Sequence, residues 1–303
     1  MEKTGYTLLK IITWIFWLFP LHVHYLFANI CYFFIYHIFR YRRDVVESNL
    51  LNSFPEKSSR ERTRIAKHFY RHFCDIFIET LYFDRISEKE GKQVVKYLNA
   101  DLPDYYMDKG RQVVVILGHY NNWEWYCNWP LYSKYPFYPV YKKIKSKAFE
   151  RFYYSLRSHF GAIPLERSLT FRKLMDNYQK GIPSMSAFLF DQTPRIYEIQ
   201  HWVNFLNQET PVILGAEKIA RKTNAIVLFA NSQKIRRGKY EVEYQLVTDN
   251  PSECEKYEIT EKCLQLLEKQ IKEHPEFWLW SHKRWKHKKN KLGKIPKVRN
   301  FES

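Results

Sequence analysis

The residues best suited to chemistry are a histidine and a glutamate five positions apart, His119 and Glu124, which follow the run Val113–Leu117. A short β-branched run of this kind is typical of a buried strand. Five residues of α-helix turn the chain through about 500°, so the two side chains would not share one helical face. They can meet if His119 lies in the turn after the strand and Glu124 in the first turn of the next helix, which Asn121 or Asn122 would cap.

This pair fits general-base catalysis on a hydroxyl group. A neutral imidazole accepts the proton, while a carboxylate holds the other ring nitrogen, fixes the tautomer and stabilises the imidazolium that forms. The alternative is that each residue serves only its own local structure, since the two types often fall five apart by accident. The rest of the chain is needed to decide between these interpretations.

Strand-like and helix-like segments alternate after residue 94, and a long amphipathic helix is predicted before them, from Ser58 or Ser59 to about Asp84. The predicted strands are 113–117, 137–141, 162–165, 183–190, 225–230 and, at an edge, 240–247; the predicted helices are 123–132, 147–160, 169–180, 210–223 and 259–272. This alternation predicts an α/β fold whose central, mostly parallel mixed sheet is flanked by helices.

The bulk composition points to anionic partners. The 303 residues carry a net charge of +17 at pH 7, which favours acidic lipid headgroups, nucleic acid or an acidic carrier protein. The five cysteines form no C-x-x-C pair, which argues against a disulfide framework or a zinc site and fits a reducing compartment.

The N-terminal segment is predicted to anchor the chain to a membrane. Residues 11–39 contain no Asp, Glu, Lys or Arg, and an uncharged apolar run of this length is a transmembrane candidate. Pro20 is expected to divide it, leaving a second part long enough to span. Arg40, Arg42 and Arg43 favour a cytoplasmic side after the run. The alternative is that the whole stretch lies in the plane of the interface.

The sequence resembles the late acyltransferases of lipid A biosynthesis, the lauroyl and myristoyl transferases of the lysophospholipid acyltransferase superfamily. Their signature is a histidine, four residues and an acid, and here it runs from His119 to Glu124. Four more blocks resemble the family in the right order: 48–56, 140–142 with Arg157 and Gly161, Asp191-Gln192, and 274–280 with 284–286. The resemblance extends from about residue 45 to residue 286.

The resemblance implies transfer of a fatty acyl chain from an acyl carrier protein thioester to a lipid hydroxyl, without a metal or other cofactor. His119 would be the general base and Glu124 would orient it. Main-chain N–H groups of residues 118–122 would stabilise the oxyanion. Arg157 would hold an anionic group of the acceptor, such as a phosphate; its alternative is a salt bridge on a helix surface.

Three further residues are expected to contribute to substrate binding: Asn121, Asp191 and Lys143. Asp191 ends a buried run and would face the crevice beyond the strand ends, or steady a turn. Lys143 belongs to a basic group at 142–151 that would steer an acidic carrier protein or simply be solvated. Residues 193–195 depart from the family pattern, which leaves Gln192 and Arg195 in doubt as site residues. The closing block contributes residues expected to pack and to anchor at the interface: Trp278, Trp280, Arg284 and Trp285.

The expected organisation is a membrane anchor at 1–43, a catalytic domain at 44–282 and a basic tail at 283–303. The enzyme would work at the cytoplasmic face of a bacterial inner membrane on a lipid A precursor; an aminolipid, a glycolipid or a lysophospholipid is the alternative acceptor, and coenzyme A the alternative carrier of the donor. Alternatives of other classes are a serine or cysteine hydrolase and a non-catalytic basic protein that binds membranes or nucleic acid. We expect no nucleic-acid partner, since no recognised nucleic-acid module is present.

Overall fold

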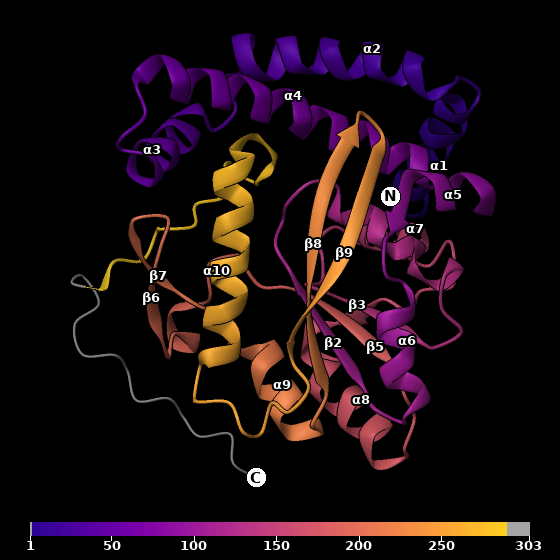
Figure 1. Ribbon diagram of the computed structural model, residues 1–303. Coiled ribbons are helices and arrows are strands. Elements are labelled where there is room, and N and C mark those ends of the chain that lie inside the picture. Colours follow the sequence, from indigo (N-terminus) through magenta and orange to yellow (C-terminus); the bar gives the residue numbers. More distant parts are fainter. Residues whose placement is uncertain (1, 290–303) are drawn as a thin grey trace.

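A computed structural model describes residues 2–289 of the protein (Figure 1). The helices are α1 (Glu2–Trp17), α2 (Leu21–Tyr32), the π-helical turn η1 (Phe33–Ile38), α3 (Arg43–Ser53), α4 (Ser59–Phe83), α5 (Glu88–Val94), α6 (Asp101–Asp108), the 3₁₀ segments η2 (Trp123–Leu131), η3 (Ile196–Glu198) and η4 (Pro275–Phe277), α7 (Lys147–Arg157), α8 (Arg167–Gln179), α9 (Gly215–Thr223) and α10 (Glu258–Glu273). The strands are β1 (Val95–Tyr97), β2 (Val113–Leu117), β3 (Phe137–Tyr141), β4 (Leu165–Glu166), β5 (Met185–Leu189), β6 (Trp202–Phe205), β7 (Gln208–Pro211), β8 (Ile226–Arg236) and β9 (Lys239–Thr248).

Seven strands form one mixed sheet in the order β1-β9-β8-β2-β5-β3-β4, and β6 and β7 form a separate hairpin. Every neighbouring pair in the large sheet is parallel except β8 and β9, which are antiparallel. The predicted α/β fold with a mostly parallel central sheet is therefore confirmed. The predicted edge position of 240–247 is wrong, because β1 pairs with β9 on its outer side. The three-residue β1 is too short to give a sequence pattern.

Two apolar cores lie on the two faces of the sheet. Side chains alternate along β5, so that Ala187 and Leu189 join one core while Phe188 joins the other. The first core is completed mainly by α6, α7 and η2, and the second by α8, α9 and α10. All five residues of β2 are buried, as expected for a central parallel strand that has helices on both faces.

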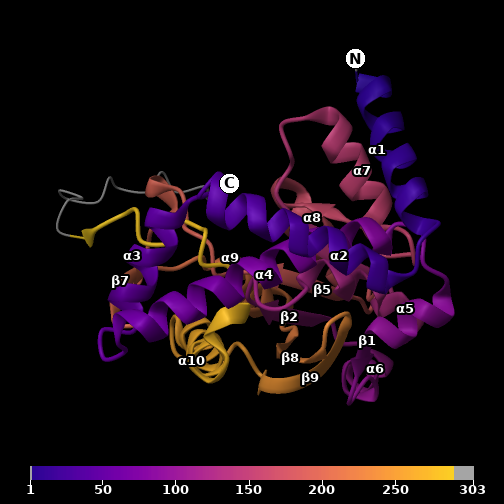
Figure 2. The same cartoon turned by 90° about the horizontal axis from the view of Figure 1, so that it is seen from above.

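The helix α4 carries a complete capping box, in which Ser58 and Glu61 satisfy each other's main-chain N–H groups, and this confirms the predicted start. Figure 1 shows α2 and α4 lying together over one end of the sheet, where the tip of the β8–β9 hairpin reaches them. In the view from above, α2 again lies alongside α4 (Figure 2).

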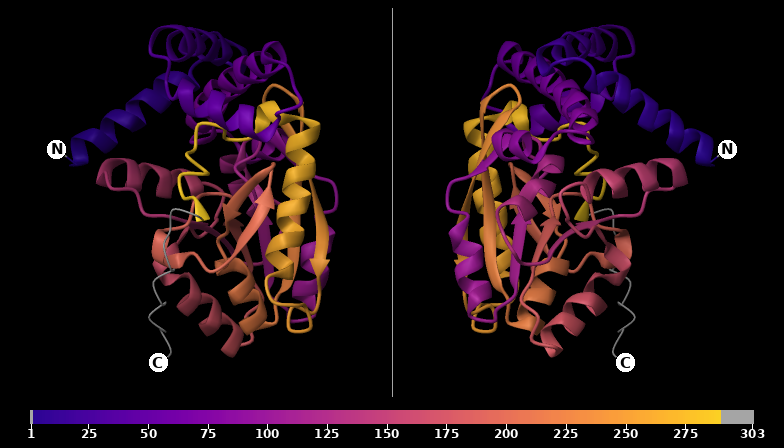
Figure 3. Two further views of the ribbon diagram at one scale, coloured as in Figure 1. Left: turned by 90° about the vertical axis from the view of Figure 1, so that its left-hand side faces the viewer. Right: turned by 90° about the vertical axis from the view of Figure 1, so that its right-hand side faces the viewer.

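The N-terminal segment is broken where expected: α1 ends at Trp17, and Pro20 precedes α2. Among residues 2–289, no helix is both long and apolar enough to cross a membrane. The predicted spanning helix is thus not found, because α2 has only 12 residues where a span needs about 20. Instead, α1 packs on α7, and both project from the same side of the molecule (Figure 3).

Three predicted elements differ in detail. The segment 123–132 is a 3₁₀ helix that contains Pro130 rather than an α-helix, since proline cannot donate an i→i−4 hydrogen bond. The strand predicted at 162–165 is reduced to two residues, and the helix predicted from 210 begins only at Gly215, because Thr210 and Pro211 belong to β7. The basic tail predicted at 283–303 lies outside the described residues from 290 onward.

Candidate active site

Strand register brings His119 to Asp191. Leu117 of β2 pairs with Leu189 of the parallel strand β5, and each candidate residue lies two positions beyond its strand. Carboxyl ends of parallel strands share one edge of the sheet. The Asp191 carboxylate accepts hydrogen bonds from the His119 main-chain N–H at 2.8 Å and from its ring Nδ1 at 2.6 Å. Asp191 is 2% exposed, so this is a buried histidine–carboxylate pair.

The pair is fixed by a third residue. The indole Nε1 of Trp278 donates to Oδ2 of Asp191 at 2.7 Å. Burial alone opposes ionisation of Asp191, but His119 and these hydrogen bonds outweigh it and lower the pKa of the carboxyl to about 2. An ionised carboxylate only accepts hydrogen bonds, so Nδ1 of His119 carries the hydrogen and Nε2 is the basic nitrogen. Nε2 meets the side-chain amide of Gln192 at 3.0 Å.

Gly118 makes this approach possible. A Cβ atom at that position would lie 2.6 Å from Cδ1 of Leu267 on α10 and 3.3 Å from Oδ2 of Asp191. Any other residue would therefore force the buried Leu267 side chain or the turn to shift, and would crowd the contact with Asp191. The glycine that ends β2 is required by packing.

Glu124 does not hold His119. Both of its carboxylate oxygens accept from Arg157, Oε2 from Nε at 2.9 Å and Oε1 from Nη2 at 2.7 Å. The side chains of Glu124 and Arg157 are only 12% and 14% exposed. Burial alone would lower the pKa of Arg157, but the contact with Glu124 outweighs it and raises that pKa. The expected His119–Glu124 contact is absent from the described hydrogen bonds, because Asp191 occupies the ring nitrogen that Glu124 was expected to hold. The alternative given for Arg157, a salt bridge on a helix surface, is correct as to the ion pair but not as to its place, since the pair is partly buried in a wall of the cleft.

The turn after His119 is held by its own side chains. Asn121 has a positive φ of 54°, and its Nδ2 donates to the Oγ and main-chain oxygen of Ser232 on β8. Asn121, predicted to bind substrate, is fully buried and is not among the described residues that line the cleft. Asn122 precedes η2 but does not cap it; its Nδ2 donates to Glu79 instead.

Two of the expected oxyanion donors are already used inside the protein. The main-chain N–H of His119 donates to Asp191, and that of Asn121 donates to the main-chain oxygen of Phe277. Among the candidate N–H groups of residues 118–122, these two are therefore not available to an oxyanion in this structure.

A cleft of about 550 Å³ opens beside His119 and extends over both faces of the sheet at its carboxyl edge. Its apolar lining on the α7 face includes Leu117, Cys127, Phe137, Ala187 and Leu189. On the α8–α9 face it includes Val140, Phe188, Phe190, Ala216 and Ile219. The strand edge that carries the histidine thus lies between two apolar arms of one cleft.

Cations surround this cleft. Five line it, against a single acid, Glu124: Lys142, Arg157, Arg167, Arg195 and Lys218. Arg157 is partly buried, and the other four are exposed. Lys143, predicted to bind substrate, is not among the lining residues; it is exposed and lies 3.6 Å from Glu166. Within residues 2–289 no three His, Cys, Asp or Glu residues are grouped to hold a metal ion.

For the closing block, the expected packing role is confirmed and the expected anchoring at the interface is wrong. Trp278, Trp280 and Trp285 are 2%, 0% and 6% exposed, so they pack in the core and do not anchor the chain at an interface. Arg284 is also fully buried. Trp278 reaches the site because Leu279 donates its main-chain N–H to the His119 oxygen. Its place in the ordered blocks was the only signal that could have indicated this.

The family of bacterial lipid A biosynthesis acyltransferases matches the chain over residues 1–287. No curated protein sequence matches it.

Proposed function

The chain belongs to the bacterial lipid A biosynthesis acyltransferase family, and from this premise we propose that it transfers a fatty acyl chain from an acyl carrier protein thioester to a hydroxyl group of a lipid A precursor. The observation that carries the proposed chemistry is His119, whose Nδ1 is held by buried Asp191 while Nε2 faces the cleft. Such an arrangement suits a general base for a hydroxyl group.

The proposed step is a direct transfer. Nε2 of His119 takes the proton of the acceptor hydroxyl, which replaces the Gln192 amide as its partner. The oxygen attacks the thioester carbonyl, and the new C–O bond forms as the C–S bond breaks. The imidazolium, stabilised by Asp191, returns the proton to the departing thiolate. The products are an ester and a free thiol, without a covalent intermediate on the enzyme.

The cleft suggests where the substrates lie. Its two apolar arms suit acyl chains, because each is lined by aliphatic and aromatic side chains of one core. The exposed cations Arg167, Arg195 and Lys218 suit a phosphate on the acceptor. A phosphorylated, acylated acceptor suits both features: the acyl chains meet the apolar lining, and the phosphate meets cations that also contact side chains of their own surroundings, such as Glu198 beside Arg167 and Gln200 beside Lys218.

We also propose that the N-terminal segment binds the surface of the membrane. Exposed apolar side chains are concentrated on α1, α2 and η1, among them Trp14, Trp17, Phe27, Phe33 and Phe39. Short helices with such faces suit the interfacial plane, which was the alternative to a spanning helix. In the proposed arrangement α7, which packs on α1 and carries Arg157, brings the cleft close to the lipid surface at the cytoplasmic face of a bacterial inner membrane.

Purified protein in detergent, given acyl carrier protein thioester and an under-acylated lipid A precursor, tests the proposal. We expect mass spectrometry to show one added acyl chain on the precursor and release of one thiol per ester. The parallel reaction with a lysophospholipid acceptor should be much slower. Faster acylation of the lysophospholipid, or an acyl group trapped on the protein, would overturn the proposed acceptor or the direct transfer, respectively.

A further inference from the structure

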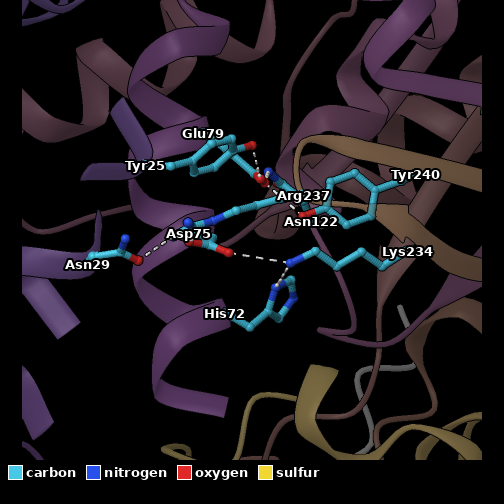
Figure 4. A network of polar contacts seen from close by, with 9 residues as sticks. All are labelled: Tyr25, Asn29, His72, Asp75, Glu79, Asn122, Lys234, Arg237 and Tyr240. Atoms are coloured by element: carbon cyan, nitrogen blue, oxygen red, sulfur yellow. Dashed lines mark hydrogen bonds and ion pairs between the residues drawn. The ribbon is translucent and has the colours of Figure 1, made fainter. Parts of the chain in front are cut away.

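A second buried carboxylate, Glu79 of α4, contacts Asn122 in the turn that follows His119 (Figure 4). It is 0% exposed and accepts three hydrogen bonds from three different elements. Oε2 accepts from Nδ2 of Asn122 at 2.7 Å and from the hydroxyl of Tyr240 on β9 at 2.8 Å. Oε1 accepts from the hydroxyl of Tyr25 on α2 at 2.8 Å.

The surroundings of Glu79 tie α2 to the β8–β9 hairpin. Asp75, one turn before Glu79 on α4, pairs with Lys234 and Arg237 of the hairpin. Arg237 also donates to Oδ1 of Asn29 on α2 at 3.0 Å and lies over the Tyr25 ring. Gly238 at the tip approaches α2 so closely that a Cβ atom would clash with Tyr25 and Leu21.

We infer that Glu79 is a positioning residue for the acyl transfer: it fixes Asn122, and through Asn122 the turn that presents His119, and it links this turn to α2 through Tyr25. The inference rests on the proposed role of His119. Glu79 contacts neither His119 nor the cleft in the described structure, so its effect is on geometry and not on the reacting atoms.

The hydrogen bonds explain why Glu79 matters for the turn that follows His119. Asn122 is fully buried, and its Oδ1 has no partner among the described residues, so the bond to Glu79 is what fixes its side chain. The main-chain oxygen of Glu79 also accepts from Nε1 of Trp125 at 2.9 Å. The turn is therefore held at two points by one residue of α4. Burial raises the pKa of the Glu79 carboxyl, and its three donors favour the ionised form.

The sequence of contacts Tyr25–Glu79–Asn122 joins the helix that we propose to lie at the membrane to the turn that carries the base. A shift of α2 would remove one donor from Glu79 and loosen its hold on Asn122. A displacement of about 1 Å at a reacting group is enough to cost up to about 10²-fold in rate.

An exchange of acid and amide tests the inference. In Glu79→Gln the new amide faces at least one donor, and in Asn122→Asp two carboxylates face each other. The double variant Glu79→Gln/Asn122→Asp restores a donor–acceptor pair with the roles reversed. We expect kcat to fall about tenfold in each single variant with KM changed less than about twofold, and to recover to within about threefold in the double variant.

A readout that is independent of acyl transfer is the rate at which diethyl pyrocarbonate modifies His119, measured by mass spectrometry of its peptide. The single variants and Tyr25→Phe should raise this rate at least about threefold, since the turn opens more readily, and the double variant should lower it again. Tyr132→Phe is the matched control. It removes a hydroxyl that donates to the main-chain oxygens of Lys92 and Val95, and it should leave both kcat and the His119 rate unchanged.

The outcomes are separable. If the single variants lower only the melting temperature, or if the double variant is worse than both singles in kcat and His119 reactivity, Glu79 is a structural residue and the inference is wrong. If wild-type protein transfers no acyl chain while the reactivity of His119 follows the expected pattern, the proposed function fails and the positioning role stands.

Discussion

Two carboxylates compete for the role of partner to His119, and the nearer one in sequence is not the partner. Glu124 is five residues away and forms a bidentate pair with Arg157. Asp191 is 72 residues away and accepts both the ring and the main-chain N–H of His119. The comparison teaches that strand register, and not spacing along the chain, determined the contact.

The physical difference lies in what precedes each acid. Asp191 follows β5, whose pairing with β2 repeats over five residues, so its position relative to His119 is set by a hydrogen-bonded ladder. Glu124 is in the first turn of η2, where a 3₁₀ segment turns its side chain toward α7. The first arrangement suits proton transfer, and the second a fixed charge pair in the wall of the cleft.

The largest expected effect is on the His119–Asp191 pair. His119→Ala should lower kcat by about 10²- to 10⁴-fold, because His119 is the only histidine among the described residues that line the cleft, while KM changes little and the melting temperature falls modestly as buried Asp191 loses its ring partner. Transfer kinetics and circular dichroism measure these quantities. The exposed His68 provides the control: His68→Ala should leave kcat unchanged, and a similar loss in both variants would contradict the assignment.

Asp191→Asn should come next, with a fall in kcat of about 10²-fold. The amide places a donor opposite Nδ1–H of His119 or Nε1–H of Trp278, so the ring loses its tautomer or its orientation. The same steady-state assay measures it.

Glu124→Gln tests the other carboxylate. We expect kcat to fall by less than about tenfold and KM for the acceptor to rise by a larger factor. The variant leaves the charge of Arg157 without its counterion, so it should also lower stability by about 1–3 kcal/mol, measured by denaturant unfolding. A loss in kcat greater than that of Asp191→Asn would break the comparison, since it would mean that Glu124 turns to His119 when substrate is bound.

The smallest expected effect is a dependence of protein stability on pH, caused by His282. Burial lowers the pKa of His282 to about 4, against the raising effect of Asp191, and Nε2 of His282 accepts from the Thr193 main-chain N–H at 3.0 Å. In the unfolded chain the His282 ring binds a proton near the ordinary histidine pKa of about 6.5. Stability from His282 is therefore complete above pH 6.5 and lost as the pH falls toward 4, by about 2 kcal/mol after allowance for its partial exposure.

His282→Gln should flatten this dependence, because glutamine does not titrate. Melting temperatures of both proteins between pH 7 and 4 test it. Parallel curves for wild type and variant would mean that His282 binds its proton over the same pH range in the folded and the unfolded chain.

Much of the fold followed from the sequence because its signals are local. The β-branched run Val113–Leu117 and the capped, amphipathic helix from Ser59 each carry their pattern in consecutive residues. Alternation of such segments was enough for a mostly parallel sheet. The short β1 and the exclusion of β9 from the edge were not predicted, since three residues carry no periodicity.

The candidate site was predicted in part. His119 and Asp191 were both expected at the crevice, and both are at the carboxyl edge of the sheet. Three contacts were not predicted, because each joins segments far apart in the chain: the His119–Asp191 bond, the partly buried Glu124–Arg157 pair and the bond between Asn122 and Glu79. Asn121 and Lys143 were predicted to bind substrate. In the structure Asn121 is buried against Ser232, and Lys143 is exposed beside Glu166.

By itself, the sequence determined which residue types stand at the ends of buried strands, because hydrophobic burial and helix capping act over a few neighbouring residues. It also contained the ordered blocks by which the family was identified. Only the tertiary structure decided which acid meets which base. A hydrogen bond requires atoms about 3 Å apart, and between distant segments that distance is set by sheet register and helix packing.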